Sequence, residues 1–335
     1  MKSRESAFSH YLGDSVRGKT KLLQSNSNAA EITSTTGITA FNSDGFTLGN
    51  GSETNLNNDD MVAWCWKAGG NKNTFNVDDV GYASASAAGI TDGTISLTGA
   101  SVGTKQGFSI LKYTGSGSNG TIAHGLSQAP DFFFGRDLED SGGTRDWIIY
   151  HQSVGRTGRL KFTTGNTSTS STFFQDTSPT NSLISIGTSD DINSTNDYIM
   201  YCWHDVPGLQ KFGSYLSIGG NDANFVYLGF KPAVLWIKSA VHQADTTSWC
   251  IFTDETYPNN PFQKPLYANK NIQEGYRGNA SNQGTFNIDL VSNGFKLLTN
   301  VGEVNEGSSG TDRYIYCAWA KQPAFGPYGS QSNAR

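Results

Sequence analysis

Pairs of acidic residues are the groups in this sequence that could hydrolyse a glycosidic bond. That reaction needs two carboxyl groups about 5 to 9.5 Å apart, one to protonate the leaving group and one to attack or to activate water. Three pairs lie in polar segments of the chain: Glu139 with Asp140, Asp254 with Glu255, and Glu303 with Glu306. No pair recurs when the chain is compared with itself, so glycan degradation is the most distant of the functions considered.

Adjacent aspartates could instead bind Ca²⁺, which takes six to eight oxygen ligands. The sequence offers three such pairs, at residues 59–60, 78–79 and 190–191. None lies in an Asp-x-Asp-x-Asp-Gly frame, and adjacent aspartates in loops commonly cap turns. The five histidines are scattered without metal-ligand spacing. We therefore predict no catalytic residue, no metal site and no cofactor.

Tryptophans and cysteines could bind sugars or metals, but their positions predict a structural core. All seven tryptophans fall in apolar runs that recur along the chain. Three cysteines occupy what looks like one equivalent position, where a cysteine behaves as a small apolar residue. The predicted core comprises Trp66, Trp147, Trp203, Trp249, Trp319, Cys65, Cys202 and Cys317.

A few polar positions have other predicted roles. Aromatic residues outside the recurring pattern are better candidates for ligand contact, and Tyr257, with Asn259 and Asn260 beside it, is the example we select. Arg17 recurs as Arg156 after a strand-like segment, and a repeated arginine in that place typically pins a loop by bidentate hydrogen bonds.

Internal repetition indicates the elements that position these residues. Residues 60–67, 198–204 and 314–319 end in nearly the same aromatic and Cys-containing run. Residues 124–134 also match 228–236, residues 146–150 match 248–252, and residues 43–48 match 292–297. The repeat is about 105–125 residues long and consists of short apolar segments separated by Gly, Asn, Ser and Thr, which is typical of strands.

The composition and the repeat together predict an all-β protein of tandem β-sandwich repeats, of jelly-roll or lectin-like type. Charged residues make up only 16% of the chain while aromatic residues make up 12%, which excludes a disordered chain. We divide the sequence into an incomplete unit 1 (1–70), a small-residue linker or arm (71–106), unit 2 (107–210), unit 3 (211–325) and an extended tail (326–335).

Unit 1 is incomplete because its first residues align with the middle of unit 3. Lys2 and Ser3 match Lys238 and Ser239, so unit 1 lacks the first strand and the strand after the x-Pro turn. A sandwich that lacks strands has an open edge. We expect the missing strands to come from residues 71–106 or from a neighbouring chain, since strand addition is a common mode of association.

Charge and hydropathy narrow the possible partners. The chain has 24 Lys and Arg against 29 Asp and Glu, a net charge of -5, and no run of basic residues, so it is not expected to bind nucleic acid. Its apolar runs are far shorter than the roughly 20 residues of a membrane span. The first residues lack the apolar core of a secretory signal, which predicts a protein made in a host cytoplasm.

Four motifs carry a resemblance to a known family. Residues 13–18 (GDSVRG), 41–49 (FNSDGFTLG), 63–70 (AWCWKAGG) and 107–115 (GFSILKYTG) occur in one order. Together they resemble a repeat of virion structural and tail-fibre-like proteins of marine tailed bacteriophages. The resemblance implies lectin-like β-sandwich repeats, a location in the virion, capsid or tail proteins as partners, and a homo-oligomer.

The sequence thus predicts a non-enzymatic virion structural protein, such as a tail fibre, a spike or a capsid decoration. Its β units would pack against neighbouring subunits and its polar loops would face outward. The alternative is a receptor-binding lectin that recognises a host surface glycan, through loops such as residues 164–182 or 254–283. A glycan-degrading enzyme is the distant third reading.

Overall fold

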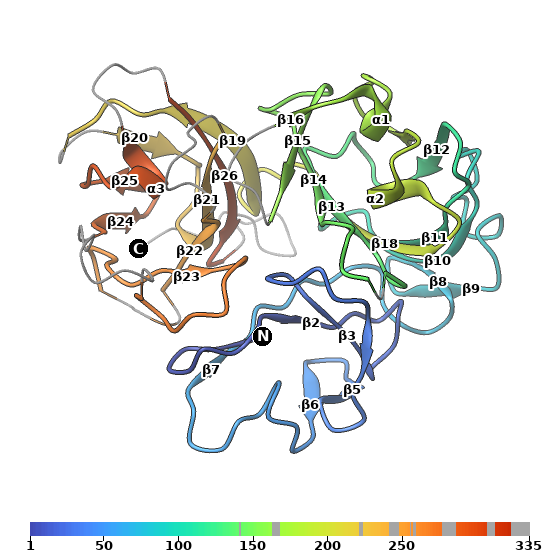
Figure 1. Ribbon diagram of the computed structural model, residues 1–335, viewed down its shortest axis with the longest axis horizontal. Coiled ribbons are helices and arrows are strands. Elements are labelled where there is room, and N and C mark those ends of the chain that lie inside the picture. Colours follow the sequence, from blue (N-terminus) through green and yellow to red (C-terminus); the bar gives the residue numbers. More distant parts are fainter. Residues whose placement is uncertain are drawn as a thin grey trace.

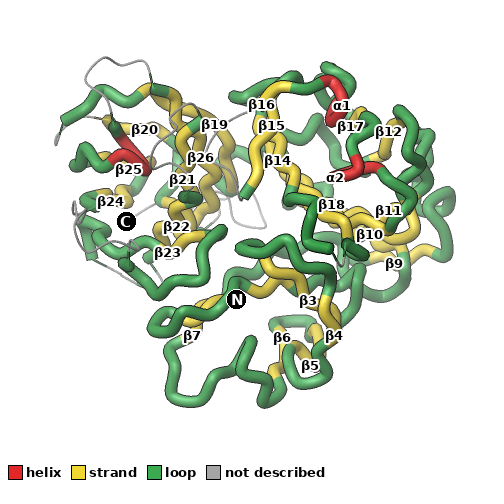
Figure 2. Tube along the Cα trace, viewed as in Figure 1, coloured by secondary structure: helices red, strands yellow, loops and turns green. Residues whose placement is uncertain are grey.

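The computed structural model describes residues 1–140, 142–162, 168–220, 224–240, 248–254, 256, 259–276, 286–306 and 312–322. Figure 2 shows that these residues form strands joined by long loops, and the predicted all-β class is confirmed. The helices of this part are single turns, α1 (Ser171–Phe174), α2 (Asp190–Asn193) and α3 (Gly302–Asn305). Within it, none is long and apolar enough to cross a membrane.

Unit 2 has a nine-stranded sheet and a small second layer. The strand order is β16 (Ser168–Thr169), β15 (Gly158–Lys161), β14 (Ile148–His151), β13 (Phe132–Asp137), β18 (Asp197–Trp203), β11 (Phe108–Thr114), β10 (Leu97–Gly103), β8 (Phe75–Val77) and β9 (Val80–Tyr82). The second layer pairs β12 (Gly120–Ala123) with β17 (Leu183–Ile186). All of these pairings are antiparallel except that of β10 with β8.

Unit 3 has the same arrangement in a shorter form. Its main sheet runs β19 (Gln210–Leu216), β26 (Arg313–Ala320), β21 (Pro232–Ser239), β22 (Cys250–Thr253) and β23 (Leu266–Tyr267). Its second layer runs β20 (Asn224–Tyr227), β25 (Gly294–Leu297) and β24 (Ile288–Val291). In both units a central closing strand, β18 or β26, pairs with the first strand of its unit on one side and with the strand after the x-Pro turn on the other.

Unit 1 consists of three small sheets. They are β1 (Lys2–Ser3) with β7 (Met61–Val62), β2 (Tyr11–Leu12) with β3 (Lys21–Gln24) and β4 (Ile32–Thr33), and β5 (Ile38–Phe41) with β6 (Phe46–Leu48). The closing strand β7 has only two residues in a ladder, and within the described residues its other edge has no strand partner. The β5–β6 hairpin carries the residues that match the β24–β25 hairpin of unit 3, so unit 1 has only a small counterpart of the second layer.

The assignment of residues 71–106 to a linker or arm was wrong. This segment forms β8, β9 and β10 and extends the sheet of unit 2, so it does not complete unit 1. Its apolar residues Ile90, Ile95, Leu97 and Val102 are buried in the core of unit 2. The segment has too few apolar residues for a core of its own, but its small side chains let it pack closely on a sheet that already exists.

Three hydrophobic cores hold the fold together. One lies between the two layers of unit 2 and one between the two layers of unit 3. The third is shared, with residues such as Leu23 of unit 1, Phe134 of unit 2 and Trp236 of unit 3. Figure 1 shows the corresponding shape, in which three lobes meet around a common centre. Each main sheet of units 2 and 3 is therefore buried on both faces.

The packing of residues 71–106 can be tested by stability. We expect Leu97→Ala to lower the free energy of unfolding by about 2–4 kcal/mol, because it removes a buried side chain and leaves a cavity. Val80→Ala in the same segment is the control, since Val80 is 51% exposed, and it should change stability by less than about 0.5 kcal/mol. Urea denaturation measures both free energies of unfolding. Equally small effects of the two substitutions would contradict the packing of residues 71–106 on unit 2 and would favour the linker or arm interpretation.

Candidate functional site

Three tryptophans, one from each unit, meet in the shared core. The ring centroids of Trp66 and Trp203 lie 6.3 Å apart, those of Trp66 and Trp319 5.2 Å, and those of Trp203 and Trp319 6.1 Å. All three pairs have edge-to-face geometry, which aromatic rings prefer over face-to-face stacking. Trp203 and Trp319 are buried and Trp66 is half-buried. These rings join units rather than form a sugar platform.

Ring N–H groups also connect the units in sequence. The indole of Trp147 in unit 2 donates to the carbonyl of Gln24 in unit 1 at 3.0 Å. The indole of Trp249 in unit 3 donates to the carbonyl of Lys161 in unit 2 at 3.2 Å. A hydroxyl makes the third contact, since the side chain of Ser25 in unit 1 donates to the carbonyl of Ala268 in unit 3. Unit 2 is thus bonded to unit 1, unit 3 to unit 2 and unit 1 to unit 3, and the three contacts close a ring.

A buried cation occupies the same register position in each unit. Lys2, Arg136 and Lys238 lie opposite aliphatic residues of the closing strands β7, β18 and β26, and none of them is exposed. Burial lowers the pKa of Lys2 to about 8 and that of Lys238 to about 7. Arg136 donates to the carbonyls of Asn28 and Ala29 in unit 1. A lysine with a lowered pKa can be a nucleophile, but one cation per unit indicates a structural role.

Arg17 pins a loop, as its sequence context suggests, and it also joins two units. Its guanidinium forms ion pairs with Asp14 and with Glu31, and it donates to the hydroxyl of Tyr201 in unit 2 at 3.1 Å. Its side chain is 1% exposed. An arginine buried this deeply is held by carboxylates on more than one side, which is the geometry that a planar guanidinium favours.

Arg156 does not share this role, which corrects the prediction. It is exposed, and within the described residues the structure shows it no hydrogen bond or ion pair. The turn after β14, where Gly155 donates to the carbonyl of His151, matches the turn where Gly18 donates to Asp14. Arg156 therefore lies just past the turn, whereas Arg17 lies inside it.

The predicted equivalence of the three cysteines was also wrong. Cys202 faces the core of unit 2, whereas Cys317 faces the shared core on the opposite side of its sheet. Tyr198 stacks on Tyr113 as Tyr314 stacks on Tyr215, so Tyr198 and Tyr314 are equivalent positions. The residue of unit 3 that is equivalent to Cys202 is then Ala318, not Cys317. The two runs are thus offset by one residue, and one residue reverses the face of a strand.

Cys65 is exposed, so its assignment to the core is corrected as well. It follows the two-residue strand β7, where the other units continue a seven- or eight-residue closing strand between two partners. The remaining predicted core residues, Trp147, Trp249, Cys202 and Cys317, are fully or almost fully buried. The fourth cysteine, Cys250, is also buried.

The acidic pairs are used as caps and ion-pair partners. Asp140 accepts a hydrogen bond from the backbone of Arg145 at 2.6 Å, and Asp254 forms an ion pair with Lys321 at 2.7 Å. Asp191 pairs with Arg159 and Lys161. Glu255 lies outside the described residues. In the part of the chain that the structure describes, no group of acidic, His or Cys side chains could hold a metal ion.

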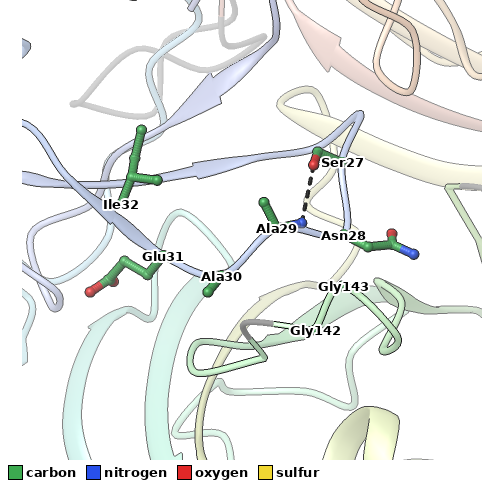
Figure 3. Close-up of a pocket in the computed structure, with 8 residues that line it drawn as sticks. All are labelled: Ser27, Asn28, Ala29, Ala30, Glu31, Ile32, Gly142 and Gly143. Carbon is green, nitrogen blue, oxygen red and sulfur yellow. Dashed lines mark hydrogen bonds between the residues drawn. The ribbon is translucent and has the colours of Figure 1, made fainter.

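Figure 3 shows an open depression between units 1 and 2. It is lined by Ser27, Asn28, Ala29, Ala30, Glu31, Ile32, Gly142 and Gly143. Among the described residues that line it, the one ionisable group is Glu31, whose carboxylate is paired with Arg17 at 3.1 Å and Lys21 at 3.3 Å. The described lining therefore offers no acid–base pair.

A serine motif in the sequence is also structural. Residues 99–103 match the Gly-x-Ser-x-Gly pattern of hydrolase elbows, which requires a sharp turn between a strand and a helix. Here the pattern lies within β10, and buried Ser101 donates to the carbonyl of Gly70 at 2.8 Å. The hydroxyl is therefore part of the sheet packing.

The predicted ligand loop of unit 3 gives one clear result. The amide of Asn260 donates to the carbonyl of Leu290 and accepts from its N–H, both at 3.1 Å. Asn260 therefore holds the loop against β24, although the residue is also exposed. Asn259 is exposed, and Tyr257 lies outside the described residues.

The outer edge of unit 3 exposes large apolar side chains that sequence reasoning missed. β19 and β20 are the end strands of their sheets. Leu216 and Ile218 are 49% and 47% exposed, and Phe225 and Tyr227 are 50% and 60% exposed. Lys211 lies at the same edge, where its ammonium donates to the carbonyl of Tyr227 at 3.0 Å. We call these residues the unit 3 edge.

The corresponding positions of unit 2 carry small or polar residues. The ladder registers match Thr114 with Leu216 and Thr121 with Phe225, and likewise Ala123 with Tyr227. This exchange is visible in the sequence, but the sequence does not show whether the apolar residues are exposed. Their exposure depends on whether another segment covers them.

Comparison with known proteins gives a family without an assigned role. Residues 1–323 match the model of a Domain of unknown function (DUF7483). No curated protein and no solved structure matches the chain.

The two arginines provide a test of the loop assignments. We expect Arg17→Ala to lower the free energy of unfolding by about 3–5 kcal/mol, because it leaves buried Asp14 without its cation. Arg156→Ala is the matched control and should change it by less than about 0.5 kcal/mol. Urea denaturation measures the free energy of unfolding of both variants. A large effect of Arg156→Ala would contradict the finding that Arg17 holds its loop and Arg156 does not.

A second prediction concerns acid stability at the contact between units 2 and 3. The ring of His151 pairs its Nε2 with the carbonyl of Tyr316 at 3.2 Å, and its Nδ1 accepts from the N–H of Ser153 at 3.1 Å. Burial lowers the pKa of His151 to about 4. The folded protein thus keeps this ring neutral while the unfolded chain protonates it near pH 6.5, so stability falls as the pH drops from about 6.5 to 4.

We expect His151→Gln to remove about 2 kcal/mol of the stability loss between pH 7 and pH 5. Glutamine retains an N–H donor and an acceptor but does not titrate. The measurement is the free energy of unfolding in urea at the two pH values. If the variant and the natural protein lose the same amount, the assignment of this proton to His151 is wrong.

Proposed function

The chain belongs to the DUF7483 family, a domain of unknown function, and we propose that it is a non-enzymatic structural protein of a tailed-phage particle. The observation that carries the proposal is the shared core. The aromatic and ionisable side chains that could do chemistry are used there to join three β units into one body. The sequence motifs that resemble virion proteins support the proposed location in the phage particle.

This architecture fits a rigid building block. Three lobes fixed around one aromatic centre keep their loops and edges at constant positions, and a subunit of a particle needs such constant geometry at its contacts. The unit 3 edge provides a surface of the kind that interfaces bury, since monomeric proteins rarely expose several large apolar residues together. We propose a homo-oligomer attached to capsid or tail proteins as a decoration, a spike or part of a fibre.

The two alternative functions have less support. Glycan hydrolysis would need free carboxylates, but Asp140 and Asp254 are engaged in a backbone hydrogen bond and an ion pair. Recognition of a host glycan by the loop around residue 260 would need polar groups directed to solvent, but the amide of Asn260 is bonded to the backbone of Leu290. These contacts favour the structural role.

Detection of the protein in purified particles tests the proposal. Phage that encode this chain would be banded in a density gradient and examined by quantitative mass spectrometry, with immunogold labelling to locate the protein on head or tail. We expect a fixed copy number per particle, in proportion to a known capsid or tail protein. Abundance in the infected lysate together with absence from the banded particles would contradict the structural role.

A further inference from the structure

The starting point is a segment that covers unit 2 but has no counterpart on unit 3. Residues 94–103 run along the first strand of unit 2, where Ser101 pairs with Ile110 and Ala100 with Leu111. The same segment reaches the second layer, since the N–H of Ile95 donates to the carbonyl of Thr121 at 2.9 Å. One extended segment thus covers the edges of both layers.

The unit 3 edge has no such cover among the described residues. Only residues 204–209 separate β18 from β19, whereas residues 63–107 separate β7 from β11. β19 and β20 therefore end their sheets, at the place where unit 2 has β10 and residues 94–95. Units 2 and 3 thus share one arrangement of strands. In unit 2 this edge is paired with another segment of the chain, whereas in unit 3 no described segment pairs with it.

The side chains at the open edge are suited to being covered. Phe225 and Tyr227 replace Thr121 and Ala123, and Leu216 replaces Thr114. Unit 2 shows that the fold does not need large apolar residues at these positions. Apolar area in contact with water is unfavourable by roughly 25 cal/mol per Å² relative to a buried state, so these residues favour a partner that buries them.

The backbone at this edge also presents hydrogen-bonding groups. The N–H of Phe212 donates to Asp205 and its carbonyl accepts from Gln152, both at 2.7 Å, so its polar groups point away from β26. By the alternation of an antiparallel ladder, those of Ser214 point the same way. The carbonyl of Tyr227 binds Lys211, and by the same alternation the groups of Phe225 point outward, as those of Thr121 do toward residues 94–95.

We propose that the unit 3 edge binds an extended, uncharged polypeptide segment, rich in small and β-branched residues, from a neighbouring protein subunit. The segment would pair with the backbone at Ser214 and Phe225 and would cover Phe225 and Tyr227, as residues 94–103 cover their counterparts in unit 2. Strand addition of this kind takes its affinity from main-chain hydrogen bonds and its specificity from alternate side chains. Lys211 disfavours a segment that places Lys or Arg beside it. The inference rests on the proposed structural role for the source of the segment, and deepens it by naming the partner's chemistry.

A peptide copied from the covering segment tests the inference. A fluorescein-labelled peptide with the sequence of residues 93–103 would be titrated with the full chain and followed by fluorescence anisotropy. We expect saturable binding with a Kd on the order of 10–100 µM, typical of a short segment that must be ordered on binding. A peptide with Ile95→Pro is the matched control and should not bind, because proline removes the donor that Ile95 gives to Thr121, the unit 2 counterpart of Phe225.

Variants of the protein locate the binding. The double variant Phe225→Thr and Tyr227→Ala installs the unit 2 residues and should weaken binding at least tenfold. Val80→Thr changes an exposed apolar residue at another sheet end and should leave binding unchanged. Circular dichroism before and after each substitution confirms that the variants fold as the natural protein does.

Three results would overturn the inference: no saturable binding, equal binding by the double variant, or equal binding of the proline peptide. Self-association that the double variant abolishes, without peptide binding, would identify a second copy's edge as the occupant instead. Glycan-array binding that the double variant loses, again without peptide binding, would identify a glycan. Detection in particles is a separate result, so absence of peptide binding with presence in virions defeats this inference alone.

Discussion

The aromatic core shared by the three units is the interaction on which the rest of the structure depends. Trp66, Trp203 and Trp319 bring the closing segments of all three units together, so the main sheets of units 2 and 3 must bury both faces. A sheet covered on both sides needs apolar residues at almost every strand position. This requirement explains how a chain with 36% hydrophobic residues has 12% aromatic residues and seven tryptophans, since its apolar residues are concentrated in the strands.

Burial on both faces also determines the use of the polar side chains. A charge taken out of water must be paired or hydrogen-bonded, or its pKa shifts. Arg17 and Arg136 meet this condition by reaching carboxylates or carbonyls that include groups of a neighbouring unit, and His151 does so as a neutral ring. The polar groups are thus distributed along the contacts between units. That distribution leaves them bound in the interior, where they specify how the units fit together and are not available to a substrate.

Units 2 and 3 show how one fold can diverge at its edge. In unit 2 a segment of the same chain covers the first strand and the second layer, and the residues below it are small or polar. In unit 3 the connection is short, no described residue covers the edge as residues 94–103 do in unit 2, and the same positions carry Leu216, Phe225 and Tyr227. The backbone is alike in both units, whereas the side chains at this edge differ. This difference is the basis of the binding role proposed for the unit 3 edge.

The sequence by itself determined the all-β class, the burial of the tryptophans of units 2 and 3 and the pinning role of Arg17, because each depends on local pattern and residue type. Only the tertiary structure decided the rest. The cysteine alignment failed because an offset of one residue reverses the face of a strand, which Cys202 and Cys317 demonstrate. Residues 71–106 lacked the apolar content of a core of their own, yet they complete a sheet built by unit 2. Whether Phe225 is exposed depends on whether a distant segment of the chain covers it. A contact between distant parts of the chain leaves no local signal in the sequence.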